Sequence, residues 1–185
     1  RVTRSREAAK ARRGQLTGRE VARMVEGEGD TRTAVPPEVE ETVTAVIDAA
    51  YHLHRGLGPG LLESVYEAVL ARLLEERGLF VERQRVVPLE FHGLRFEEAY
   101  RADLLIEGSL VLELKSVERL APVHPKQLLT YLRLLDMRVG LLINFGAPTF
   151  KAGIKRVVNP KRATLPSATS LLRVTPALPG SPADP

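Results

Sequence analysis

Asp103, Glu113 and Lys115 are the residues whose types and spacing are best suited to chemistry. Glu113 and Lys115 are two positions apart in an apolar run, and side chains two apart on a β-strand share one face of the sheet. Carboxylates in this setting can hold Mg²⁺, which binds carboxylates, water and phosphate oxygens. The three residues are therefore candidates for a centre that binds a divalent cation.

The register of a predicted β-hairpin, formed by residues 100–106 and 109–117, decides whether these candidates meet. With a three-residue loop at 107–109, residue 106 pairs with 110, and Asp103 lies opposite Glu113. Directly opposite Cβ atoms are about 5 Å apart, so the two carboxylates repel unless a cation lies between them. Alternation assigns one apolar face to Ala102, Leu104, Ile106, Leu110, Leu112 and Leu114. The same pattern also fits an ordinary half-exposed hairpin without chemistry.

Several segments together resemble the bacterial GxxExxY family. The stretch GPGLLESVY at 58–66 has Gly60, Glu63 and Tyr66 at the motif positions. The likeness continues through YRADLL at 100–105, VLELKSV at 111–117, His124, QLLTY at 127–131 and LLINF at 141–145, and it extends over residues 40–158. This family is placed in the PD-(D/E)XK nuclease-like superfamily, whose core has the element order α-β-β-β-α-β.

The resemblance implies a catalytic role for the three candidates. Asp103 matches the motif aspartate, with Ala102 in place of the proline, and Glu113 and Lys115 match the (D/E)XK element. Asp103, Glu113 and the carbonyl of Leu114 are then expected to hold Mg²⁺ or Mn²⁺. Lys115 is expected to orient the attacking water or to stabilise charge on the phosphate.

The resemblance also implies roles for residues on two helices. Glu63 matches an acidic residue that faces the same site and is expected to act in catalysis by binding metal-bound water or a second ion, although it also fits a carboxylate that complements the dipole at a helix N-terminus. Gln127 and Tyr131 resemble a Q-xxx-Y element that positions the nucleic-acid strand, and they also fit residues that tie the helix to the sheet. Tyr66 is expected to be a core residue or to support the site rather than to catalyse.

The periodicity of apolar residues predicts the elements that position these residues. Helices are expected at Glu38–Arg55, Leu62–Arg77 and His124–Asp136, and Val65, Val69, Leu70, Leu73 and Leu74 are expected to line the buried side of the second. Strands are expected at 79–91, interrupted at Pro88, and at 100–106, 109–117, 139–145 and 155–158, while 94–99 is expected to be a short strand or the approach to the next one. This order predicts an α/β sandwich with a mixed central sheet flanked by helices. Together with the resemblance, it predicts a PD-(D/E)XK nuclease-like α-β-β-β-α-β core preceded by an extra N-terminal helix.

The length, composition and charge distribution of the chain indicate one domain with a tail at each end. The chain has 185 residues, 44% of them hydrophobic, and no apolar run long enough to span a membrane. The net charge of +4 divides unevenly: residues 1–37 carry +4, 38–150 carry −5 and 151–185 carry +5. We expect a flexible basic arm at 1–37, the domain at 38–158 and a disordered Pro-rich tail at 159–185. Met24 lies inside the arm and is a candidate for the natural start.

The function expected from these observations is Mg²⁺- or Mn²⁺-dependent hydrolysis of DNA or RNA. Cysteine is absent, which excludes disulfides and thiolate metal sites and is consistent with a bacterial cytoplasm. Two alternatives remain: a catalytically silent module of the same fold that binds nucleic acid or a protein, and a structural subunit of a larger assembly.

Overall fold

The computed structural model describes residues 15–25 and 35–160. Its helices are α2 (Gly18–Val25), α3 (Pro37–Leu57), α4 (Glu63–Glu76), α5 (Val123–Leu134) and the short α6 (Phe150–Gly153). Its strands are β1 (Val81–Phe91), β2 (Leu94–Ile106), β3 (Leu110–Lys115), β4 (Val139–Asn144) and β5 (Ile154–Val158).

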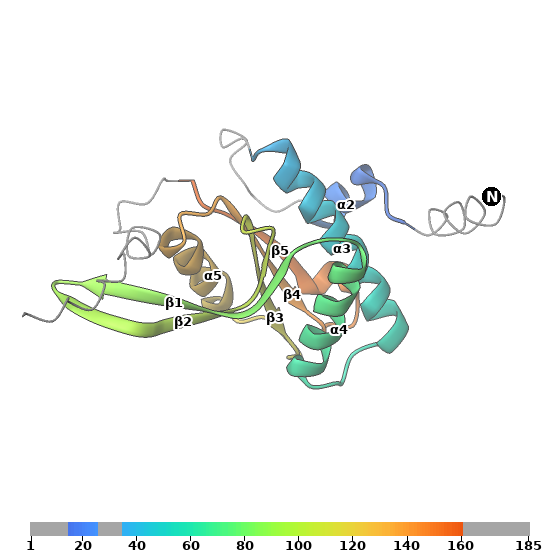
Figure 1. The fold of residues 1–185 in the computed structure, drawn as a ribbon. Helices are drawn as coiled ribbons and strands as arrows, with labels where there is room; N and C mark the ends of the chain where they lie inside the picture. Colours follow the sequence, from blue (N-terminus) through green and yellow to red (C-terminus); the bar gives the residue numbers. More distant parts are fainter. Residues whose placement is uncertain (1–14, 26–34, 161–185) are drawn as a thin grey trace, which may run out of the picture.

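The five strands form one mixed sheet in the order β1-β2-β3-β4-β5. Only β3 and β4 run parallel, and the other neighbours are antiparallel. Helices α3 and α4 lie on one side of the sheet and α5 on the other, while the β1–β2 hairpin extends beyond the remaining strands (Figure 1). The predicted α/β sandwich with a mixed sheet flanked by helices is therefore confirmed.

Burial on both faces explains the composition of the two central strands. All six residues of β4 are buried, as are the first five residues of β3. Leu112 and Leu141 pack toward α3 and α4, whereas Val111 and Leu142 pack toward Leu128 of α5. A strand covered on both faces needs apolar residues at every position, so Glu113, near the end of β3, is an exception that requires an explanation.

The predicted hairpin register is confirmed between β2 and β3. Ile106 pairs with Leu110 and Leu104 with Leu112, which leaves a three-residue loop at 107–109. The predicted apolar face is wrong for Ala102, which packs with Leu105 on the α5 side, whereas Leu104 packs on the α3–α4 side. The chain therefore changes face at Asp103, an irregularity that strict alternation does not contain.

Two further expectations differ from the structure. Residues 94–99 and 100–106 are one continuous strand, β2, and β1 pairs with it on both sides of a register shift between Val87 and Leu89, at Pro88. Within the arm expected at 1–37, Gly18–Val25 forms helix α2, and its Val21 is buried against the core. The remainder of that arm, apart from 15–17 and 35–37, and residues 161–185 of the expected tail lie outside the described residues.

The buried side of α4 is only partly as predicted. Leu70 and Leu74 are fully buried, but Val65 is 38% exposed, and Val69 and Leu73 are half-buried. Tyr66, Glu67 and Ala71 are buried as well; they complete the buried set. The helix is thus rotated so that a carboxylate, Glu67, faces inward.

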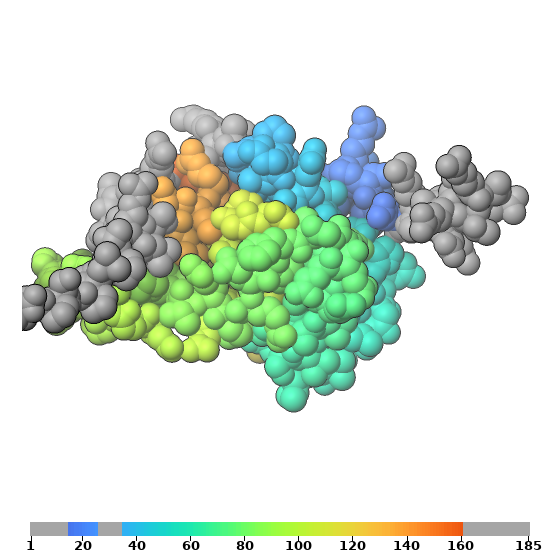
Figure 2. All heavy atoms as spheres, in the orientation of Figure 1, coloured from blue at the N-terminus to red at the C-terminus, as the bar shows by residue number. Residues whose placement is uncertain are grey.

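Helix α4 and the neighbouring strand β1 are exposed on the face of the molecule that is turned toward the viewer in Figure 2, where their atoms are teal and green. None of the helices in residues 15–25 and 35–160 combines the length and the apolar character needed to cross a bilayer.

Candidate active site

The site begins where β2 and β3 separate. Their pairing ends at Leu104 and Leu112, so no strand partner is paired with Leu114 on that side. Instead, the Leu114 N–H donates to Asp103 Oδ2 at 2.7 Å, and the Leu114 carbonyl accepts from Lys115 Nζ at 2.7 Å. The side chains of Asp103 and Lys115 therefore make the hydrogen bonds to Leu114 that a neighbouring strand would otherwise make, and they meet at the end of β3.

Glu113 and Lys115 lie together beside this opening. Lys115 Nζ donates to Glu113 Oε1 at 2.7 Å, and the side chains of Lys115 and Glu113 are 17% and 7% exposed respectively. The second carboxylate oxygen, Glu113 Oε2, is buried and has no hydrogen-bond partner among the described residues. A buried oxygen of a carboxylate without a partner is costly, so the arrangement favours a ligand at this oxygen.

Helix α4 adds two carboxylates to the same region. Glu63, the first residue of the helix, lies 3.6 Å from Lys115 Nζ and is 42% exposed. Glu67, one turn later, is buried, and its two oxygens accept from Arg83 Nε at 2.9 Å and Gln84 Nε2 at 2.7 Å. Sequence reasoning missed Glu67 and Gln84. The available signal for Glu67 was its i, i+4 spacing from Glu63, which places both on one helix face.

The pKa values of the site residues are shifted by burial and by the negative charge of the neighbouring carboxylates. Burial raises the pKa of Glu113 to about 7, and the nearby charge of Asp103 adds to this rise, although Lys115 opposes it. Burial likewise raises the pKa of Asp103, more than the Leu114 N–H and Lys115 lower it. Burial lowers the pKa of Lys115, but its bond to Glu113 and the surrounding carboxylates outweigh burial and raise it above its ordinary value. Lys115 is therefore a stable ammonium group.

Tyr131 of α5 is near enough to Glu113 and Asp103 for their charges to affect its pKa, whereas Gln127 is exposed on the surface. Burial raises the pKa of Tyr131 to about 12, and the charges of Glu113 and Asp103 contribute, so its hydroxyl stays protonated as a donor. Its ring packs edge-on against Tyr100 of β2, with the centroids 4.7 Å apart. Gln127 is one helical turn earlier and exposed.

Tyr66 fixes the loop that precedes α4. It is fully buried, and its hydroxyl donates to the Gly58 carbonyl at 2.6 Å and accepts from the Leu61 N–H at 3.2 Å. Its ring stacks on Phe145 with the centroids 4.4 Å apart. Gly60 has φ +112°, a conformation that favours glycine. Tyr66 thus sets the direction in which α4 begins and carries Glu63 toward Lys115.

The chain after Lys115 is held by a second anchor. The buried Asn144 side chain accepts from the Val117 N–H at 3.0 Å and donates to the Val117 carbonyl at 2.8 Å. Gly146 passes so close that a Cβ added there would lie 2.5 Å from the Val117 carbonyl oxygen. These contacts fix the end of β3 and hence the position of Lys115.

The residues at the site fit a small divalent cation. Within 15–25 and 35–160, no group of three or more acidic, histidine or cysteine side chains is placed to hold a metal. Mg²⁺, however, often binds through one or two carboxylates and completes its shell with water and phosphate oxygens. Asp103 and Glu113 supply two carboxylates, and Glu113 Oε2 is a buried oxygen without a partner among the residues described. The donor set therefore suits Mg²⁺ or Mn²⁺ better than a metal that requires several protein ligands.

The charges around the site support the same conclusion. Four carboxylates face two cationic side chains, which leaves a net charge of −2 when all are ionised; the groups are Glu63, Glu67, Asp103 and Glu113 with Arg83 and Lys115. One divalent cation bound there would compensate that charge.

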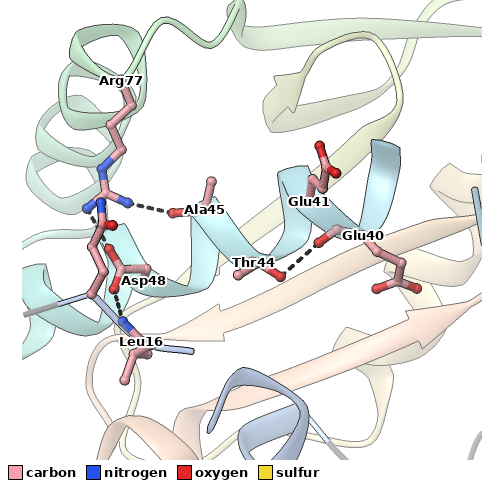
Figure 3. A pocket seen from close by; sticks show the side chains of 8 residues that line it. Leu16, Glu40, Glu41, Thr44, Ala45, Asp48 and Arg77 are labelled. Atoms are coloured by element: carbon pink, nitrogen blue, oxygen red, sulfur yellow. Dashed lines mark hydrogen bonds and ion pairs between the residues drawn. The ribbon is translucent and has the colours of Figure 1, made fainter. Parts of the chain in front are cut away.

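A separate cavity of about 580 Å³ lies along α3, away from this cluster, and Leu16, Asp48 and Arg77 are among its lining residues (Figure 3). Three of its four charged lining residues already have partners, since Asp48 pairs with Arg77 and Glu40 pairs with Arg156. We therefore assign no binding role to this cavity.

Comparison with known proteins gives one match. Residues 40–157 match the family model described as the PD-(D/E)XK nuclease superfamily. No curated protein and no solved structure matches the chain. The matched segment begins within α3, ends within β5 and includes every residue of the candidate site.

Proposed function

The chain belongs to the PD-(D/E)XK nuclease superfamily, and we propose that it is a Mg²⁺- or Mn²⁺-dependent nuclease that hydrolyses phosphodiester bonds in DNA or RNA. The observation that carries the proposal is the buried Oε2 of Glu113, unpartnered among the described residues, beside Asp103 in a site with more carboxylates than cations. A structural hairpin gains nothing from such an arrangement, because buried uncompensated charge destabilises a protein.

Each residue has a distinct task in the proposed reaction. Asp103 and Glu113 hold the cation, with the Leu114 carbonyl as a further oxygen ligand. The bound ion supplies the polarisation of the phosphodiester and lowers the pKa of a water molecule. Lys115 keeps its proton, so it donates to the phosphate or to the attacking water and stabilises negative charge in the transition state.

Lys115 must exchange partners in this scheme. Its ammonium group is bonded to Glu113 Oε1 and to the Leu114 carbonyl, two of the groups proposed as ligands. With a divalent cation bound at these oxygens, Glu113 would no longer depend on Lys115 for compensation, and the Lys115 ammonium group would be free to turn toward the substrate. Tyr131 and the exposed Gln127 lie on the adjacent face of α5 and are proposed to position the strand.

We also propose that the chain is a member of the GxxExxY family. Each motif position has a physical task that supports this assignment. Gly60 adopts a positive φ, Tyr66 bonds the loop around it, and Glu63 begins α4 within 3.6 Å of Lys115. The GxxExxY motif thus positions the N-terminus of α4 at the edge of the site.

Cleavage of supercoiled plasmid and of a structured RNA, each with Mg²⁺, Mn²⁺ or EDTA, tests the proposal. Wild type is expected to cut at least one substrate with metal and neither with EDTA. Lys115→Ala and Asp103→Ala should both lose cleavage, whereas Lys155→Ala, an exposed lysine on β5, should retain it. Cleavage that survives Lys115→Ala refutes the assignment of the site. Mn²⁺ binding without cleavage of either substrate favours the catalytically silent alternative.

A further inference from the structure

Gln84 has an unusual backbone conformation for a residue in the middle of a strand. Its φ is +51°, in the left-handed region that costs a non-glycine residue about 1 kcal/mol or more. Pairing of β1 with β2 is regular on both sides, with Arg83 opposite Leu104 and Arg85 opposite Ala102. Gln84 therefore lies opposite Asp103, at the point where β2 changes face.

The strained residue makes contacts that link two carboxylates. Gln84 Nε2 donates to Glu67 Oε2 at 2.7 Å and, over a longer 3.4 Å, to Asp103 Oδ1. Asp103 Oδ2 is already held by the Leu114 N–H at 2.7 Å. Both oxygens of Asp103 are thus oriented, one by β3 and one by Gln84. Strain maintained at a site by such contacts points to function.

The chemistry of the amide suits this location. Gln84 joins two anions as a neutral donor, so it orients Asp103 and preserves the negative charge that attracts a cation. A lysine or arginine at the same place would make similar bonds but would compensate the carboxylates itself. Arg83 Nε contacts Glu67 Oε1 at 2.9 Å, which is the oxygen that Gln84 does not contact, and about half of the Arg83 side chain is exposed.

We propose that Gln84 is a positioning residue for the metal site: its left-handed backbone directs a neutral amide between Glu67 and Asp103 and fixes Asp103 in its metal-binding orientation. This inference rests on the proposed function. It adds two residues, Gln84 and Glu67, that support a ligand without touching the cation. Loss of such support typically weakens metal binding 10- to 100-fold.

Mn²⁺ titration by calorimetry, with the melting temperature as a second readout, tests this inference. Gln84→Gly accepts the positive φ without strain and removes only the amide, so Mn²⁺ affinity should fall about 10- to 100-fold while the fold is retained. Gln84→Asn also tolerates a positive φ and keeps a shorter amide, so its Mn²⁺ affinity should lie between those of Gln84→Gly and wild type. Gln84→Lys should weaken Mn²⁺ binding at least as much as Gln84→Gly, because it adds a competing cation.

Arg85→Gly is the matched control, because it places a glycine in the same strand one residue later and removes only the pair with Glu82. It should bind Mn²⁺ as wild type does. Equal Mn²⁺ affinity in wild type and Gln84→Gly overturns the inference and leaves the nuclease proposal standing. Absence of Mn²⁺ binding and of cleavage in wild type overturns both. If Gln84→Gly does not fold, the comparison of Gln84→Asn with Gln84→Lys decides, and equal affinities again overturn the inference.

Discussion

Asp48 and Glu113 are two buried carboxylates in similar surroundings but with different partners. Their side chains are 5% and 7% exposed, and each has one oxygen without a hydrogen bond among the described residues. Asp48 nevertheless has a guanidinium nitrogen of Arg77 2.8 Å from that oxygen, an ion pair whose angles do not meet hydrogen-bond geometry. Its other oxygen accepts from the Leu16 N–H at 2.7 Å (Figure 3).

Glu113 is compensated far less completely. Lys115 binds only its Oε1, and the same ammonium group is also shared with the Leu114 carbonyl. Further carboxylates, from Asp103 and Glu63, raise its pKa rather than lower it. Burial alone therefore does not mark a functional acid: Asp48 is compensated by the protein, whereas Glu113 has only the shared ammonium group of Lys115 and is the acid for which we propose a cation.

The largest expected effect separates catalysis from stability at Glu113. Glu113→Gln should reduce cleavage by about 10³-fold, or about 4 kcal/mol, because it removes a ligand of the cation. Its free energy of unfolding without metal at pH 8 should not fall, since the change removes a buried, poorly compensated charge. Initial cleavage rates and urea unfolding measure the two effects. A variant that is destabilised but still cleaves would show that Glu113 is structural.

Asp48→Ala should have the opposite profile. The change leaves Arg77 and the Leu16 N–H without their partner, so the free energy of unfolding should fall by about 3 kcal/mol. At a temperature where the variant remains folded, its cleavage rate should be within a few-fold of wild type. Urea unfolding and cleavage at low temperature provide the measurements. A selective loss of cleavage would make the α3 cavity part of the functional surface and remove the distinction between the two carboxylates.

Periodicity and loop length predict the register of the β2–β3 hairpin from the sequence. The expected pairing of Ile106 with Leu110 is observed, but the pairing ends at Leu104 and Leu112, so the expected pair of Asp103 with Glu113 is not part of the ladder. The roles of Gln127 and Tyr131 came only from the resemblance, and only Tyr131 is coupled to the acids in the structure. Their proposed task on the substrate remains a prediction.

The roles of Gln84 and Glu67 at the site were not predicted from the sequence, and the reason is physical. A left-handed glutamine inside a strand has no local signature, because its strain is balanced by contacts with residues far away in sequence. The same irregularity moved Ala102 to the opposite face from the one that alternation predicts. Helix α2 was missed because a short segment in a basic arm gains its stability from packing of Val21 on the core rather than from helix propensity.

The pH dependence of stability should be an effect of about 3 kcal/mol that distinguishes Glu113 from a compensated acid. Its pKa is about 7 in the folded protein, against 4.5 for an ordinary glutamate in the unfolded chain, so the folded state keeps its proton to higher pH than the unfolded state. The contribution to stability is therefore complete below pH 4.5 and is lost as the pH rises through 7. Urea unfolding in EDTA should show this loss in wild type and a smaller one in Glu113→Gln.

Metal should reverse that loss. Saturating Mg²⁺ compensates the ionised carboxylates, so wild type at pH 8 should regain stability that Glu113→Gln does not regain. Mn²⁺ affinity should increase with pH up to about 7, because the proton and the cation compete for Glu113. Identical pH profiles of unfolding in wild type and Glu113→Gln would show that Glu113 titrates as an ordinary surface carboxylate.

The smallest expected effect is at Glu63, which is partly exposed and contacts Lys115 rather than the buried oxygens. Glu63→Gln should change the free energy of unfolding by no more than about 0.5 kcal/mol and reduce cleavage by less than tenfold, through a less firmly oriented Lys115. Glu76→Gln, at the other end of α4 and paired with the exposed Arg72, should change neither quantity. If Glu63→Gln instead abolished cleavage and Mn²⁺ binding as Glu113→Gln is expected to do, Glu63 would be a third carboxylate ligand. The cation would then lie nearer to α4 than the partners of Asp103 and Glu113 indicate.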